Sequence, residues 1–299
     1  MIPRDYITEW RAEAPWVQDF QVEQDLVICR ALVAIFTHPV LAKSLAFRGG
    51  TALYKLHIKP PARYSEDIDL VQVNAEPAGP LMDALHDALD GWLGKPRYKQ
   101  SEGRVTLTYR FDSEDTPPLP LKLKVEINSR EHFAVCGFKS MRFSVASRWF
   151  GGACDVLTYE LDELLATKLR ALYQRRKGRD LFDLAVALES QSVDPARIVA
   201  AFREYMEHGG HRVIRTQFEE NLAAKLTDPR FTADIGPLLS TGATLPTVGG
   251  GGLSDGPSLG GPLKGGPAPV GRHTWDIAAA AGVVSSRLIA ILPDAPNRP

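Results

Sequence analysis

The chain has 299 residues, of which 44% are hydrophobic and 24% are charged, and 35 basic residues against 36 acidic ones give a formal net charge of −1. This composition is typical of a soluble globular protein with one large domain or two smaller ones. The near-neutral charge excludes a globally basic nucleic-acid-binding protein, so any contact with nucleic acid requires a local positive patch.

Signals for secretion, membrane insertion and disulfide bonding are lacking. The first 20 residues mix charged and aromatic side chains without an apolar signal-peptide core, and no run approaches the ~20 apolar residues of a membrane span. Three scattered cysteines, Cys29, Cys136 and Cys154, form neither a disulfide framework nor a CxxC metal motif, which favours a reducing compartment. We therefore expect a cytoplasmic protein with no membrane partner.

Hydrophobic periodicity predicts an α+β N-terminal part. Apolar residues recur at helical spacing over 22–44, where His38-Pro39 is expected to separate two helices. A short apolar run at 45–47, either a strand or a helix end, leads to a glycine turn at Gly49-Gly50. The other predicted elements are helices over 51–56 and 80–93 and strands over 68–73, 104–111 and 121–128, with further strands before residue 155.

The pattern changes to helices after Glu160, over 160–175, 181–188, 195–208 and 215–225. Glycine and proline dominate 241–272, which predicts a flexible linker, and helical spacing returns over 275–292. We therefore predict four regions: an α+β domain over 1–155, a helical domain over 156–240, the linker over 241–272, and a C-terminal helix and tail over 273–299.

The residues that carry chemistry are concentrated in 65–70 (SEDIDL). Side chains two residues apart on a strand share a face, so Asp67 and Asp69 are predicted to point to one spot while Ile68 and Leu70 are buried. Two carboxylates placed in this way repel each other unless a cation lies between them. Mg²⁺ suits the position because it takes oxygen ligands from one or two carboxylates and from substrate phosphates.

The glycine turn at Gly49-Gly50 is expected to bind phosphate. Glycines let backbone N–H groups approach phosphate oxygens closely, and the helix predicted to follow presents its positive N-terminal end. Thr51 adds a hydroxyl group, and Arg48 can engage two phosphate oxygens at once. Residues 48–51 are therefore predicted to hold the triphosphate of an NTP beside the metal.

A third carboxylate, Glu126, lies on a strand whose apolar residues at 121, 123, 125 and 127 alternate with polar ones. Glu126 is a candidate third metal ligand, or the base that accepts the proton of an attacking hydroxyl group. A solvated face of alternating charge is the competing interpretation, and we favour it for Lys122 and Lys124.

Two further candidates lie in the helical part. Lys168 falls on the apolar stripe of the helix over 160–175, where a lysine must pair, extend to solvent or meet a ligand, and we favour a triphosphate contact. The segment 175–183 (RRKGRDLFD) is a basic cluster that runs into an acidic helix start. Asp180 can cap that helix, and Arg179 is a candidate phosphate ligand within a patch for an NTP or an RNA backbone.

Together these motifs resemble those of the AbiEii/AbiGii (MenT-like) nucleotidyltransferase toxins, a branch of the DNA polymerase β superfamily. The similarity covers about residues 15–240 and rests on Gly49-Gly50-Thr51, Ser65-x-Asp67-x-Asp69, Lys168, and the K-x-R-D-L-x-D-L run over 177–184. It implies a polymerase β-like mixed sheet with helices, followed by a helical region. It also implies that Asp67 and Asp69 hold Mg²⁺, that Ser65 lies in the nucleotide site, and that activity requires Lys168 and Asp180.

The resemblance also implies a biological role. Members of the family transfer a nucleoside monophosphate from an NTP onto an acceptor, in some cases the 3′ end of tRNA, which blocks translation and arrests growth until a cognate antitoxin neutralises them. The gap between Gly50 and Asp67 is longer than in the compact core of the superfamily, although long gaps are usual in this branch. The stretch 241–272 looks like an insertion, which leaves the packing of the C-terminus open.

Two alternative functions remain open at this point. A small-molecule nucleotidyltransferase, such as one that modifies an antibiotic, would use the same residues, and a catalytically silent protein could bind partners through the same fold. Paired carboxylates argue against the silent protein, which has no physical reason to keep them. The segment 208–211 (HGGH) lacks a third metal ligand, and hydrolase, Walker and Rossmann motifs are missing from the sequence.

Overall fold

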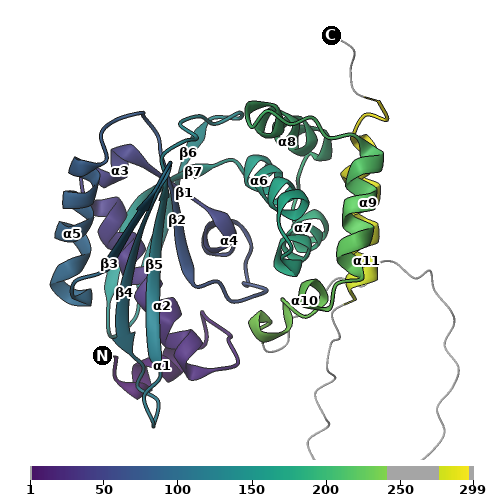
Figure 1. Ribbon diagram of the computed structural model, residues 1–299. Helices are drawn as coiled ribbons and strands as arrows, with labels where there is room; N and C mark the ends of the chain where they lie inside the picture. The colour runs from purple at the N-terminus through teal and green to yellow at the C-terminus, as the bar shows by residue number, and fades with distance from the viewer. Residues whose placement is uncertain (1, 241–275, 296–299) are drawn as a thin grey trace, which may run out of the picture.

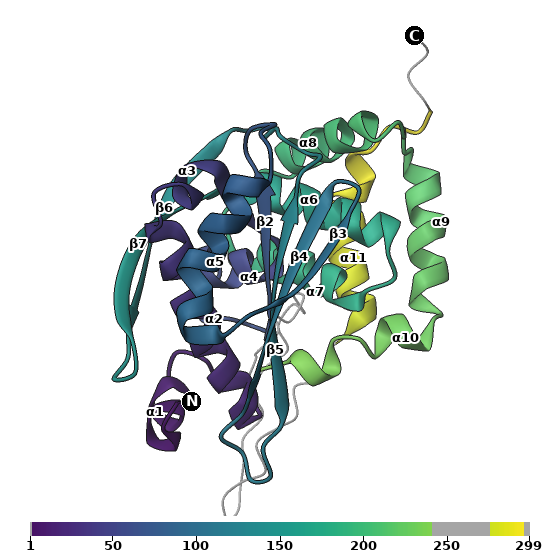
Figure 2. The ribbon, with the colours of Figure 1, turned by 60° about the vertical axis from the view of Figure 1, so that its left-hand side comes forward.

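In the computed structural model, which describes residues 2–240 and 276–295, a seven-stranded sheet lies between two groups of helices (Figures 1 and 2). The strand order is β3-β4-β5-β2-β1-β7-β6. The sheet is mixed, since β2 pairs with β5 and β1 pairs with β7 in parallel, while the other neighbours are antiparallel. The strands are β1 (Leu45–Arg48), β2 (Asp67–Gln72), β3 (Arg97–Ser101), β4 (Arg104–Asp112), β5 (Pro120–Asn128), β6 (Phe138–Ala146) and β7 (Gly151–Tyr159).

Helices of the N-terminal half cover one side of the sheet, and those of the C-terminal half form a second layer (Figures 1 and 2). The first group is α1 (Arg4–Trp10), α2 (Asp19–Thr37), α3 (Leu41–Ser44) and α5 (Gly79–Leu93), whereas the short α4 (Gly49–Ala52) lies on the other side of the sheet, toward α6 (Figure 1). The second group is α6 (Leu161–Gln174), α7 (Gly178–Ser190), α8 (Pro195–His208), α9 (Arg215–Leu226), α10 (Pro229–Thr232) and α11 (Ile277–Arg287). Short 3₁₀ turns occur at Gly236–Leu238 and Ile289–Ile291.

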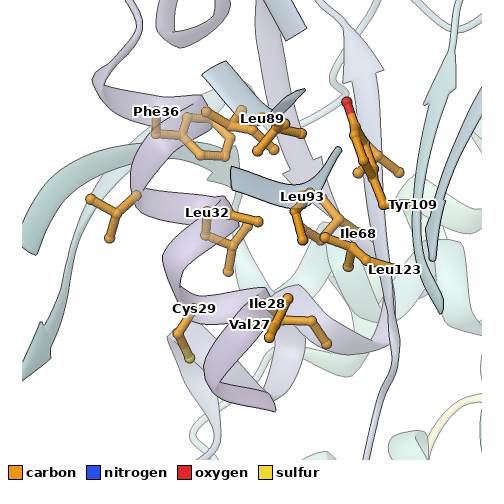
Figure 3. Packing of buried hydrophobic residues seen from close by; sticks show 14 of the residues in the cluster. Val27, Ile28, Cys29, Leu32, Phe36, Ile68, Leu89, Leu93, Tyr109 and Leu123 are labelled. Atoms are coloured by element: carbon orange, nitrogen blue, oxygen red, sulfur yellow. The ribbon is translucent and has the colours of Figure 1, made fainter. Parts of the chain in front are cut away.

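The main core lies between the sheet and α2 and α5. In β4 and β5 every second side chain is buried, which is the period-2 pattern of a sheet with one covered face. Figure 3 shows Ile28 and Leu32 of α2, Leu89 and Leu93 of α5, and Leu123 of β5 within this cluster. The opposite face of β2, β4 and β5 is thereby left free for polar side chains.

A second hydrophobic cluster holds the C-terminal helices together. It contains buried residues of α6 to α11 and also Leu53, Tyr54 and Ile58, which lie in or next to a π-helix (Leu53–His57) that continues α4. Because the chain contributes to this cluster before residue 60, the helical layer is tied directly to the Gly49-Gly50 turn that begins α4. The division into domains at residue 155 stays a proposal, and the linker predicted over 241–272 lies outside the described residues.

Most of the predicted elements are present, and the predicted α+β class with a mixed sheet is confirmed. α2 ends at Thr37 and α3 begins at Leu41, so His38-Pro39 does separate two helices. The apolar run at 45–47 is a strand, β1, and the helix predicted over 51–56 is α4 followed by the π-helix. Helix α1 and strand β3 were not predicted. Within the described ranges, no helix is both long and apolar enough to cross a membrane.

The packing of β5 against α2 and α5 leads to a testable expectation. Leu123 is fully buried, so Leu123→Ala should lower the free energy of unfolding by about 2–5 kcal/mol through lost transfer energy and the cavity left behind. Urea denaturation followed by circular dichroism measures this change. Leu119→Ala is the control, because Leu119 is 40% exposed and should change stability by less than about 1 kcal/mol. Equal effects at the two positions would contradict the described core.

Candidate active site

Strand β2 carries Asp67 and Asp69 on the polar face of the sheet, because Ile68 and Leu70 alternate with them and are buried. The neighbouring strands place other charged residues beside them. Asp69 lies opposite Arg48 of β1 and Glu126 of β5, and Asp67 lies opposite Lys124 of β5. The register therefore brings three predicted carboxylates together on one face.

Close packing requires glycine at positions 49 and 50. Gly49 has φ +83°, and a Cβ atom there would lie 2.3 Å from Oδ2 of Asp69. A Cβ atom at Gly50 would lie 2.4 Å from Nη2 of Arg63 and 3.1 Å from Oγ of Ser65. The glycine turn thus packs its backbone directly onto one carboxylate and one buried guanidinium group.

The electrostatics of the carboxylate pair favour a bound cation. Burial raises the pKa of Asp67 to about 6, and the nearby charge of Asp69 adds to this rise while Lys124 opposes it. Burial also raises the pKa of Asp69, although Arg48 works against the shift. Two acids that are hard to ionise together form a donor set that fits a hard divalent ion such as Mg²⁺, whose other ligands come from phosphates and water.

The carboxylate of Glu126 is engaged by two cations. Its carboxylate forms ion pairs with Lys124 at 2.7 Å and Arg104 at 3.2 Å. Among the described residues, no group of three or more His, Cys, Asp or Glu side chains is arranged to hold a metal ion. We therefore assign the metal to Asp67 and Asp69 as a proposal and consider Glu126 for proton transfer.

A cavity of about 560 Å³ opens over the two aspartates, and the glycine turn, β5, α6 and the start of α7 line it. Its lining is strongly cationic, with nine Arg or Lys residues against four carboxylates. The nine are Arg48, Arg63, Arg104, Lys124, Lys168, Arg170, Arg175, Lys177 and Arg179. Such a cavity suits a substrate with several negative charges, because low-dielectric walls strengthen the attraction.

Lys168 lies at the edge of this cavity and is held by two buried carboxylates. Its Nζ lies 2.7 Å from Oδ2 of Asp183 and 3.3 Å from Oδ1 of Asp180. Asp180 is fully buried and also accepts hydrogen bonds from Arg175 at 2.6 and 2.7 Å. Asp180 does not line the cavity, so we regard it as a positioning residue for Lys168 and Arg175.

Arg63 is a residue of the site that sequence reasoning missed. Its side chain is buried and forms a bidentate ion pair with Asp183, with N–O distances of 2.6 and 2.7 Å. Tyr54 donates a third hydrogen bond to Asp183 at 2.8 Å. Burial alone would raise the pKa of Asp183, but Arg63 and Lys168 hold it well below its usual range. This pair links the loop before β2 to α7.

A second missed group is Glu131, which joins two cations of the cavity. Its carboxylate lies 2.8 Å from Nη1 of Arg48 and accepts two hydrogen bonds from Arg170, at 2.6 and 3.1 Å. The side chain of Asn128 fixes the loop by accepting hydrogen bonds from the backbone N–H groups of residues 130 and 131. Glu131 follows a strand in an irregular loop, where periodicity gives no signal.

Of the remaining predicted residues, some line the cavity and others do not. Ser65 lines the cavity, whereas Thr51 is buried, donates a hydrogen bond to the carbonyl of Asp67 at 2.5 Å and lies outside the cavity lining. Arg179 lines the cavity but is held by Asp234 through two hydrogen bonds at 3.0 and 3.1 Å. The structure therefore brings together all the predicted site residues except Thr51 and Asp180, which lie directly behind the cavity.

An acidic strand beside a glycine turn in a cation-lined cavity suits a nucleoside triphosphate, whose phosphates are stabilised by metal ions and cationic side chains. The family model described as nucleotidyl transferase AbiEii toxin, type IV toxin–antitoxin system, matches residues 30–250, which is most of the chain. The chain belongs to this family of nucleotidyltransferase toxins, as its motifs predicted.

A solved structure shows the same fold. MenT4, a nucleotidyltransferase toxin from Mycobacterium tuberculosis H37Rv, matches with a TM-score of 0.61 and 18% identity over 99% of this chain and 91% of its own. A putative nucleotidyltransferase from H. pylori matches with a TM-score of 0.46 and 15% identity over 74% of this chain and 87% of its own. No curated protein matches the chain.

The buried pair between Arg63 and Asp183 should be important for stability. Asp183→Asn leaves Arg63 and Lys168 without their full negative partner, so the free energy of unfolding should fall by about 3–5 kcal/mol. Urea denaturation measures this loss. The control is Asp155→Asn, because Asp155 forms an exposed pair with Arg142 and should cost less than about 1 kcal/mol. If the two variants are equally stable, the network does not join the layers as described.

Glu131 should contribute stability that depends on pH. Burial would raise its pKa, but Arg170 and Arg48 lower it from 4.5 to about 2, so its contribution is complete above pH 4.5 and is lost as the pH falls toward 2. Glu131→Gln should therefore cost about 1–3 kcal/mol at pH 7 and progressively less below pH 4.5. Urea unfolding between pH 3.5 and 7 measures this difference. Glu102→Gln, at an exposed ion pair with Arg130, should give a small difference at every pH.

Proposed function

We propose that this enzyme transfers a nucleoside monophosphate from an NTP onto the 3′ end of tRNA in an Mg²⁺-dependent reaction that blocks translation and arrests growth. The observation that carries the proposal is the pair of Asp67 and Asp69 packed against the glycine turn inside a cation-lined cavity. Membership of a type IV toxin family supports the toxic role and an antitoxin partner. We place the reaction in the cytoplasm, where tRNA and NTPs are available.

In this mechanism Asp67 and Asp69 would hold Mg²⁺, and the ion would offset the negative charge of the substrate phosphates. The backbone of Gly49-Gly50 and the Lys168 ammonium group bind the β- and γ-phosphates and keep the chain of phosphates in line. These contacts are preorganised, because Lys168 is already fixed by two buried carboxylates.

The chemical step is a displacement at the α-phosphorus. The acceptor 3′-hydroxyl oxygen forms a bond to that phosphorus, and the bond from the phosphorus to the oxygen that bridges to the β-phosphate breaks, so that pyrophosphate leaves. Glu126 accepts the hydroxyl proton, since it lies beside Asp69 in register and lines the cavity. Its ion pairs with Lys124 and Arg104 hold the carboxylate in position.

Replacing one metal-binding carboxylate tests the proposal directly. Asp67→Asn should reduce the transfer of label from α-³²P-NTPs to total tRNA by on the order of 10³-fold, because a metal contributes several kcal/mol to such a reaction. The fold should persist, since the substitution removes one of two mutually repelling charges. Asp155→Asn, at an exposed carboxylate outside the cavity lining, is the control and should label tRNA normally.

Retained labelling by Asp67→Asn would remove the metal assignment. Sequencing of RNA 3′ ends after brief expression in cells identifies the acceptor and the added base together. Label that passes to an aminoglycoside instead of RNA would support the small-molecule alternative. Failure of the wild-type protein to bind Mg²⁺-NTP would support the silent binding protein.

A further inference from the structure

One polar face of β3, β4 and β5 is basic and continues the face that carries Asp67 and Asp69. Alternation within β4 and β5 puts the residues of this face on the side opposite the buried core, and the pairing of β3 with β4 places Arg97 and Lys99 on the same side. We call it the basic face, and its cations are Arg97, Lys99, Arg104, Arg110, Lys122 and Lys124. The carboxylates on the same face of these three strands are Asp112 and Glu126.

The register arranges the basic face in rows that lead to the proposed metal site. One row crosses the sheet from Arg97 through Thr108 and Lys124 to Asp67. The next row crosses from Lys99 through Thr106 and Glu126 to Asp69. Neighbouring strands are about 4.8 Å apart, so the cations of β3 lie about 14 Å from the aspartates. The threonines between them add hydroxyl groups that can bind phosphate.

The cations of the basic face are open to solvent. All of them except Lys124, which is half-buried, are exposed. Helices α2 and α5 cover the other side of these strands, and α6 and α7 lie across from the polar side (Figures 1 and 2). The face is therefore accessible to a large ligand that reaches the catalytic cavity from the edge of the sheet.

Most of the positive charge on the basic face has no carboxylate partner. Within residues 2–240 and 276–295, Arg97, Lys99, Arg110 and Lys122 form no ion pair with a carboxylate. The opposite edge of the sheet is different, because Lys139 of β6 pairs with Glu160 and Arg142 pairs with Asp155. In a chain of net charge −1, such a separation of charge creates the local positive patch that a polyanion requires.

A second cavity of about 430 Å³ adjoins the basic face at its end. Ser101, Arg104 and Asn128 of the polar face line it, and Arg48, Arg170 and Gln174 are shared with the catalytic cavity. The remaining polar wall includes Arg130 and His211. Its volume falls within the roughly 300–1,000 Å³ of ligand sites, so it can take a terminal group of a longer ligand.

We propose that the basic face binds the phosphate backbone of the RNA acceptor and that the second cavity receives its 3′-terminal nucleotide. This inference rests on the proposed nucleotidyl transfer and adds the surface that delivers the acceptor hydroxyl group to it. Contacts of this kind fix the position of the RNA and do not read its bases. The enzyme therefore recognises an RNA end mainly through charge and shape.

Charge reversal at the outer strand tests the basic face. The double variant Arg97→Glu/Lys99→Glu should weaken binding of a fluorescein-labelled RNA stem-loop with a single-stranded 3′ end roughly tenfold, and should lower the slope of log affinity against log salt by about 1.5. Fluorescence anisotropy without NTP measures both quantities. In transfer assays the KM for RNA should rise while kcat and the KM for the NTP stay unchanged.

A matched control is Lys43→Glu/Arg142→Glu, which makes the same charge change at exposed positions on α3 and β6. It should bind the RNA as tightly as the wild type. The proposal that the basic face binds RNA would be overturned if both double variants bound RNA equally and with equal salt slopes. It would also be overturned if the wild type bound no RNA.

That outcome differs from failure of the proposed function. Transfer that depends on Asp67 but goes to a protein or a small molecule would keep the nucleotidyl transfer and reject the RNA surface. Transfer that persists in Asp67→Asn, with RNA binding still sensitive to the charges on β3, would reject the metal assignment and keep the RNA surface.

Discussion

The buried ion-pair network around Asp183 is the interaction on which the geometry of the site depends. Arg63, in the loop before β2, and Lys168, on α6, share this one carboxylate of α7. Burying such charges is costly unless every partner is present, so the three elements can adopt only relative positions that satisfy the network. Since Arg63 also packs beneath Gly50, the helical layer fixes the glycine turn to which the NTP phosphates are proposed to bind.

Carboxylates also fix cationic side chains in the other walls of the cavity. Four of its cationic groups are held by carboxylates that lie behind the lining: Arg48 and Arg170 by Glu131, Arg175 by Asp180, and Arg179 by Asp234. Side chains fixed in this way lose little conformational freedom when a polyanion binds. The two aspartates of β2 differ from these groups, since they repel each other, and a divalent ion held between them would remove that repulsion.

The sequence correctly predicts the features that local hydrophobic periodicity determines. Alternation in β2 identifies the shared face of Asp67 and Asp69, and the lysine on an apolar helix stripe marks Lys168 as unusual. Arg63 and Glu131 lie in loops, where no period applies, and their partners are distant in the chain. Their roles depend on how the sheet and the helical layer meet, which a single sequence does not contain.

The strand β3 was missed for a related reason. Its residues 97–101 (RYKQS) are all exposed and show no apolar alternation, so its strand conformation comes from pairing with β4 rather than from burial. The two charges on β3 also protect an exposed sheet edge from pairing with other chains, and edge protection alone would explain them.

Edge protection does not, however, explain why the charges are unpaired or where they lie in the register. Paired charges also protect an edge, since β6, the other edge strand, carries cations that are paired with carboxylates. On β3 both charges are positive, both lack a carboxylate partner within the described residues, and both fall in rows that end at Asp67 and Asp69. A requirement for one sign along a path toward Asp67 and Asp69 is the expected consequence of the anionic acceptor that we propose.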